Sequence, residues 1–130
     1  MRGAPGSQVT DDQAAQGRAW QERIRGTFSA AFAAVDLVLT PTVPVRSKVI
    51  GVDEIGDLHY RAVLSYFSAI VNHALLPAIA MPLRGTGGPP LSLQAIGPMN
   101  GEDILFGFAR SLEAAGVVGF VPADTHPKTP

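Results

Sequence analysis

The stretch NHALLPAIAMPLRGTGGPPLSLQAIG, residues 72–97, carries the clearest indication of the fold. It contains two short, mainly apolar runs, Ala78–Met81 and Leu91–Ile96, separated by residues rich in glycine and proline. Short apolar runs bounded by turn residues are typical of buried strands, and a short Gly/Pro connection between two of them indicates a hairpin. The stretch therefore predicts two paired strands of one sheet.

A third strand is expected upstream, at Leu37–Leu39, where a continuous apolar run is stopped by Pro41. Residues 41–56 hold prolines, glycines and mixed charge, which indicates a loop. Asp57 is a candidate cap for a helix whose apolar stripe is Tyr60, Leu64, Phe67 and Val71. A strand, a crossover helix and a second strand make a βαβ unit, so we expect the first and second strands to run parallel with a right-handed connection.

Two further helices flank this unit. The first covers residues 11–34, because Thr10 and Gln13 form a capping-box pattern and an apolar stripe follows at helical spacing: Trp20, Ile24, Phe28, Ala31, Phe32 and Val35. The last begins after Asn100, a candidate cap, and stops at Gly116. We expect these aromatic side chains to belong to the core.

The predicted fold is α/β, with a three-stranded mixed sheet and about three helices. Residues 1–9 are interpreted as a flexible N-terminus, 10–116 as the α/β segment and 117–130 as a tail. The three strands show little polar alternation, so they need cover on both faces and neighbours on their edges. Three helices are too few for this, and we therefore interpret the sheet as a slice of a larger one.

Composition excludes several classes of function. The chain has 130 residues, a formal net charge of −1 and no cysteine. No basic run supports nucleic-acid binding, and no apolar run approaches the ~18–20 residues that span a bilayer. No thiolate or histidine spacing fits a metal site. We expect a soluble, cytoplasmic protein that uses neither metal nor cofactor.

The order and spacing of several short motifs make residues 18–115 resemble the C-terminal part of the amidase signature family. The matching positions are Asp36, Pro41, Thr42, Pro44, Asn72, Ala74, Leu76, Pro77, Ala78, Met81, Pro82, Gly88, Pro90, Leu93, Gln94, Ile96 and Gly97. The resemblance implies a single large α/β domain around a long mixed sheet, of which this chain would be roughly the last quarter. It also implies an enzyme that cleaves amide bonds.

The same resemblance implies that the chain lacks the family's chemistry. The catalytic Ser–cis-Ser–Lys triad of such enzymes lies far N-terminal to the matched part, and no Gly-Gly-Ser-Ser stretch occurs here. The only lysines are Lys48, in a polar loop, and Lys128, in the tail, whereas a lysine base needs burial or a neighbouring cation to lower its pKa. We expect no catalytic residue in this chain.

Three positions depart from the family pattern. Leu75 and Ser92 stand where the family usually has glycine, so local packing is expected to differ. Ser65 stands where the glutamine-using branch carries a substrate-reading aspartate. This argues against glutamine as the substrate and leaves the amide undefined.

Candidate site residues are therefore few. Ser65 and Ser68 are candidates for the acyl-side wall of a substrate pocket, with plain surface or packing roles as the alternative. A different triad could draw on these serines, His59 or His73, and Asp57 or Asp103, but no nucleophile-elbow motif supports it. The glycines at 85–88 lack the Lys-Ser/Thr of a phosphate loop, which favours a hairpin turn.

We expect the chain to be the C-terminal portion of an amidase signature hydrolase, catalytically incomplete alone. The alternatives are a non-catalytic subunit that complements a separate N-terminal half, and a binding module that kept an amidase-like fold. The partners expected are an N-terminal amidase half, or a second copy bound through exposed sheet surface.

Overall fold

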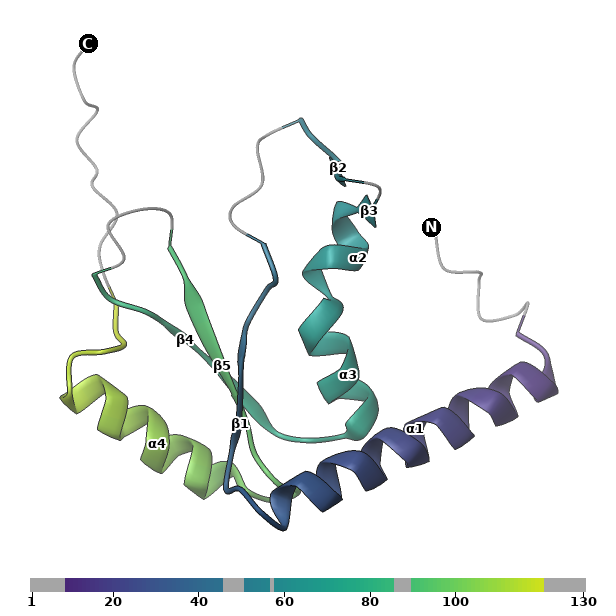
Figure 1. Ribbon diagram of the computed structural model, residues 1–130, viewed down its shortest axis with the longest axis horizontal. Helices are drawn as coiled ribbons and strands as arrows, with labels where there is room; N and C mark the ends of the chain where they lie inside the picture. The colour runs from purple at the N-terminus through teal and green to yellow at the C-terminus, as the bar shows by residue number, and fades with distance from the viewer. Residues whose placement is uncertain (1–8, 46–50, 57, 86–89, 121–130) are drawn as a thin grey trace.

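The structure is a computed structural model and describes residues 9–45, 51–56, 58–85 and 90–120. Figure 1 shows the elements in chain order: α1 (Asp11–Phe32), β1 (Val38–Pro41), β2 (Glu54–Ile55), β3 (Leu58–His59), α2 (Tyr60–Leu64), α3 (Tyr66–Ala74), β4 (Ala78–Pro82), β5 (Ser92–Ile96) and α4 (Glu102–Ala114). The α/β class and the predicted order of strands and helices are confirmed.

The main sheet has three strands in the order β1-β5-β4. Strand β5 pairs antiparallel with both neighbours, with Ala95 opposite Leu39 on one side and Ile79 on the other. The predicted hairpin between β4 and β5 is therefore confirmed. Strands β1 and β4 run parallel to each other as expected, but β5 lies between them. Both ladders are consequently antiparallel where we expected a mixed sheet, because the hairpin strand folds back into the gap left by the crossover.

Helix α4 covers one face of this sheet on the β4 side (Figure 1). Its Leu105 forms a buried cluster with Met81, Ala95 and Val118. Met81 and Ala95 come from β4 and β5, and residues opposite one another across a ladder share a face. We call α4 and the three strands the sheet layer. It holds the main hydrophobic core of the described residues.

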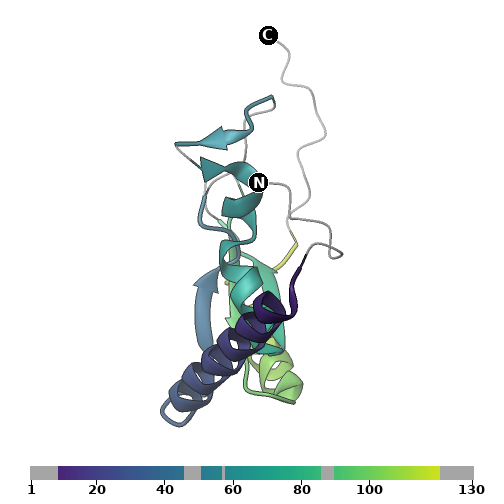
Figure 2. The ribbon, with the colours of Figure 1, turned by 90° about the vertical axis from the view of Figure 1, so that its right-hand side faces the viewer.

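The remaining helices form a second unit, which we call the arm: α1, α2 and α3. Helix α1 extends away from the strands on the opposite side from α4, and α2 and α3 rise beside it (Figures 1 and 2). The contact between α1 and α3 includes the rings of Trp20 and His73, which meet edge to face at 5.1 Å between centroids. None of the described helices is long and apolar enough to cross a membrane.

The expected apolar stripe of α1 is only partly buried. Ile24 is buried, but Trp20 is 42% exposed, so the prediction that Trp20 belongs to the core is wrong. The stripe has the right spacing, and Thr10 and Gln13 form the predicted capping box. What α1 lacks is a second surface to pack against, since α3 is the main element that it contacts in the described chain.

The single helix expected after residue 57 is broken into α2 and α3 at Ser65, whose φ and ψ are −89° and 1°. In α2, Val63 is buried, whereas Leu64 of the predicted stripe is 36% exposed. The predicted cap, Asp57, lies outside the described residues. His59 caps α2 instead, because its Nδ1 accepts from the Arg61 N–H at 3.2 Å. The region predicted as a loop, residues 41–56, contains the short strand β2, which pairs antiparallel with β3 just beyond that region.

The start of α4 lies one residue later than predicted. Gly101, not Asn100, is the cap residue, and Asn100 adopts a left-handed φ of 59° that asparagine tolerates well. A Cβ on Gly101 would lie 2.8 Å from the carbonyl oxygen of Pro98. Only glycine fits this close approach. The predicted stop is confirmed, since Gly116 follows α4 with a φ of 71°.

Candidate functional site

The motif residues of β1 and β5 are joined by side-chain hydrogen bonds across the sheet. Thr42 Oγ1 donates to Ser92 Oγ at 2.8 Å, and Ser92 Oγ donates to the carbonyl of Met81 at 3.1 Å. Gln94, only 6% exposed, donates from Nε2 to Thr40 Oγ1 at 3.2 Å. Ser92 thus connects β5 to β4 and to Thr42, the residue that follows β1. These polar groups are occupied in fixing strand register, and none is poised as a nucleophile.

A second group of motif residues closes the turn between α3 and β4. The carbonyl of Asn72 accepts from the N–H of Leu75, which has a left-handed φ of 57°. The glycine that the resemblance implies at this position fits this geometry, because a left-handed residue with a side chain is strained. The carbonyl of Pro77 then accepts from the N–H of Gly97 at 3.0 Å, which joins the residue just before β4 to the residue just after β5.

The other predicted motif positions are spread over the surface of the sheet layer. Asp36 is exposed, and the carbonyl of Pro82 accepts from Gly119. Pro41 and Pro90 line a groove of about 480 Å³ beside β1 and β5. Gly88 lies outside the described residues. Residues 117–119, which we assigned to the tail, lie against the end of β4 through a bridge between Leu83 and Val118.

The two candidate pocket serines lie in the arm, at the α2–α3 junction. Ser65 Oγ donates to the carbonyls of Arg61 and Ala62, at 3.1 and 3.4 Å, and Ser68 Oγ donates to the carbonyl of Ser65 at 3.5 Å. Both hydroxyls bond main-chain carbonyls of the preceding turn. Neither serine lines the groove beside β1 and β5, and their pocket role stays a prediction.

The alternative triad is not assembled by the described residues. His59 uses its Nδ1 to cap α2, and His73 packs against Trp20. Asp103 is exposed in the first turn of α4, and Asp57 lies outside the described part of the chain. Within the residues that the structure describes, no group of three or more His, Cys, Asp or Glu side chains is placed to hold a metal ion.

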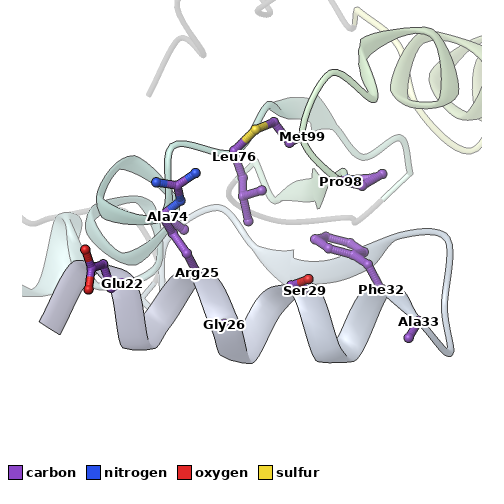
Figure 3. A pocket seen from close by; sticks show the side chains of 10 residues that line it. All are labelled: Glu22, Arg25, Gly26, Ser29, Phe32, Ala33, Ala74, Leu76, Pro98 and Met99. Carbon is purple, nitrogen blue, oxygen red and sulfur yellow. The ribbon is translucent and has the colours of Figure 1, made fainter. Parts of the chain in front are cut away.

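A larger groove of about 670 Å³ lies between α1, the end of α3 and the residues just after β5 (Figure 3). Gly26 and Ser29 of α1 and Ala33 just after it line one side of the groove, and Leu76 and Met99 line the other, with Leu76 pointing toward α1 (Figure 3). The charged side chains of its lining, Glu22 and Arg25, gather toward the α3 end. Sequence reasoning missed this groove, although the small residues at helical spacing were a signal for it.

Comparison with known proteins places these features in a family. The family model described as Amidase matches residues 2–106. A glutamyl-tRNA(Gln) amidotransferase subunit from Halobacterium salinarum is 33% identical over 101 residues, which are 78% of this chain and 23% of that protein. The same subunit from Streptococcus equi subsp. zooepidemicus is 36% identical over 91 residues, 67% of this chain and 18% of that protein. The chain thus spans about a fifth of the length of these relatives.

Solved structures agree on the fold. A vestigial protein complex, described as revealing the evolutionary origins of an s-triazine catabolic enzyme, matches with a TM-score of 0.76 and 21% identity. The match covers 87% of this chain and 26% of that one. The glutamyl-tRNA(Gln) amidotransferase subunit from Thermotoga maritima matches with a TM-score of 0.60 and 26% identity, over 74% of this chain and 21% of that one.

Proposed function

The chain belongs to the Amidase family, and from this premise we propose that it is the C-terminal segment of an amide-cleaving enzyme and is inactive by itself. The proposal rests on a contrast between fold and catalytic groups. The chain shares its fold with a solved structure over 87% of its length, but none of the described serine side chains is hydrogen-bonded to a histidine or lysine that could act as a base. The described serine hydroxyls that donate hydrogen bonds donate them to main-chain carbonyls. From the resemblance, we expect the nucleophile and the lysine base to lie outside this segment.

In the complete enzyme, we propose, a serine from the remaining polypeptide attacks the carbonyl carbon of a carboxamide. The amine leaves with a proton and water then hydrolyses the acyl-enzyme. The present segment contributes β1, β4 and β5 to the sheet and part of the pocket wall. Ser65 in place of an acidic side chain supports an amide other than glutamine.

The pocket role proposed for Ser65 and Ser68 is tested in the complete enzyme. Ser65→Ala and Ser68→Ala should raise KM and leave kcat nearly unchanged, because a binding contact is lost without loss of the nucleophile. Ser111→Ala is the matched control, since Ser111 Oγ also donates to a carbonyl of its own helix, Gly107, at 3.0 Å. If all three variants behave alike, the two serines have no pocket role.

Inactivity alone is tested with the purified 130-residue chain. We expect no hydrolysis of a panel of aliphatic and aromatic amides, and no labelling by a fluorophosphonate that reacts with activated serines. Amide hydrolysis that this reagent abolishes would contradict the proposal. A chain inactivated by heat serves as the control for contaminating or non-enzymatic turnover.

A second candidate function is that of a separate subunit that complements an amidase half encoded elsewhere. Among the described residues β1 is an outer strand of the sheet, which favours this function because an unpaired strand edge is a template for another chain. A denaturing immunoblot of the source cells distinguishes the two. A band well above 13.6 kDa supports a segment of a longer enzyme, whereas a band at this mass that co-purifies with a larger amidase-family chain supports the subunit.

A further inference from the structure

A strip of polar side chains runs along one face of α2 and α3 in the arm. Its members follow one another at intervals of four, three and four residues: Arg61, Ser65, Ser68 and Asn72. Side chains at this spacing lie on the same face of a helix. All of them are exposed except the half-buried Ser68, whereas Val63 and Ala74 on the other side of these helices are buried. The polar strip is thus the face of α2 and α3 that points away from their buried contacts.

The break between α2 and α3 does not interrupt this strip. Ser65 N–H donates to the carbonyl of Arg61 at 3.3 Å, and Ala69 N–H donates to that of Ser65 at 2.8 Å. Both hydrogen bonds span four residues as in an α-helix, so the helical turns continue through Ser65. Arg61 and Ser65 therefore lie one turn apart, about 5.4 Å along the helix axis.

The hydroxyl groups of the strip present hydrogen-bond acceptors to a ligand. A serine hydroxyl has one proton to donate and two lone pairs that accept. Ser65 Oγ donates its proton to the carbonyl of Arg61 at 3.1 Å, and Ser68 Oγ donates to the carbonyl of Ser65 at 3.5 Å. Because their protons are used in this way, both oxygens are left as acceptors. The N–H groups of a carboxamide are donors that suit them.

Arg61 presents the opposite chemistry at the other end of this turn. Its guanidinium carries a permanent positive charge and five N–H donors, arranged in a plane that matches a carboxylate. It is the only Asp, Glu, Lys or Arg side chain in residues 60–74, all of which the structure describes. The strip therefore offers a counter-charge to an anion, and none of its own side chains is an acid that would neutralise an ammonium group.

From this order of groups we infer that Arg61 is a specificity-determining residue, which binds a carboxylate of the substrate while Ser65 and Ser68 accept from the amide N–H. The inference rests on the proposed function, in which these serines belong to the pocket wall and the remaining polypeptide supplies the nucleophile. The substrate class is a monoamide of a dicarboxylic acid that carries no ammonium group. Glutaramate has a suitable length, since its extended chain separates the carboxylate carbon from the amide carbon by about 5 Å.

The test compares matched substrates in the complete enzyme: succinamate and glutaramate against butanamide and pentanamide, in which a methyl group replaces the carboxylate. We expect kcat/KM to be about 10- to 100-fold higher for the better anionic amide, because a hydrogen bond to a charged group contributes about this factor. Arg61→Gln should abolish the preference by raising KM for the anionic amides, with the neutral amides unchanged. Arg61→Lys should keep part of it, because lysine keeps the charge and loses the planar fork.

Arg110→Gln is the matched control, since Arg110 is an exposed arginine of α4, and it should leave the preference unchanged. An unaltered enzyme that cleaves amides without preferring the anionic ones overturns the inference and leaves the proposed function standing. This comparison does not depend on any variant folding. An equal loss of anionic and neutral substrates in the Arg61 variants also overturns the specificity role. A complete protein that cleaves no amide at all overturns the proposed function as well.

Discussion

The sheet layer and the arm contain similar apolar residues but bury them to different extents. In the sheet layer, α4 lies across two paired strands, and Leu105, Met81 and Ala95 are buried together. In the arm, α1 packs mainly on α3, and Trp20 and Tyr66 are exposed. An apolar stripe therefore becomes a core only where a second layer is available. Within the described residues, the contact between α1 and α3 is the main packing that the arm has.

The largest effect should come from the core of the sheet layer. Leu105→Ala removes a side chain that is 3% exposed, and we expect a loss of about 2–5 kcal/mol in the free energy of unfolding. Ile104→Ala, at the neighbouring and 46% exposed position, should stay within about 0.5 kcal/mol. Urea unfolding followed by far-ultraviolet circular dichroism measures both. Similar losses from the two variants would mean that α4 does not cover the sheet as described.

The next effect separates two glycines of the same region. Gly101→Ala places a Cβ 2.8 Å from a backbone oxygen and should cost about 1–3 kcal/mol through the shift that it forces. Gly107→Ala meets nothing within 4 Å inside α4 and should stabilise the helix by up to about 1 kcal/mol. Thermal unfolding of both variants checks the opposite signs. Two changes of the same sign would contradict the tight packing assigned to the start of α4.

A smaller effect tests the polar connection across the strands. Ser92→Ala breaks the hydrogen bonds that join Thr42 to the carbonyl of Met81, with an expected cost of about 1 kcal/mol. Hydrogen exchange of β5 amides should accelerate while that of α1 amides stays unchanged. Ser111→Ala, which removes a hydroxyl bonded within its own helix, is the control. Equal acceleration in both units would show that the arm and the sheet layer unfold as one.

The smallest expected effect lies at the junction of the two units. Leu75 has a φ of 57° and an exposed side chain, so Leu75→Gly should relieve left-handed strain. The greater freedom of glycine in the unfolded chain offsets part of this gain, and we expect about 0.5–1 kcal/mol of stabilisation. Leu75→Ala keeps the strain and should give no gain in chemical denaturation. A loss of stability on Leu75→Gly would show that the leucine side chain contributes packing at the junction.

Local signals in the sequence predicted most helices and strands. Contacts with residues distant in the chain decide which side chains are buried, and these contacts were not predicted. The Thr10 and Gln13 capping box and the Gly116 stop depend only on neighbouring residues, and both are confirmed. The residue at the break is Ser65, which is neither glycine nor proline. The apolar spacing therefore predicted one continuous helix and gave no signal of the break. The exposure of Trp20 was also missed, because spacing reports which residues share a face and does not report what that face contacts.

The amino-acid sequence alone was sufficient to predict the α/β class, the hairpin between β4 and β5, and the motif order that leads to the Amidase family. Turn residues and apolar periodicity are local, so they can be read along the chain. The position of β5 between β1 and β4, and the cover that α4 gives to only the β4 side of one face, emerged from the three-dimensional structure. Strand order depends on contacts between residues far apart in sequence, which no local pattern encodes. The same long-range placement makes β1 and β4 the outer strands of the sheet in the described part of the chain.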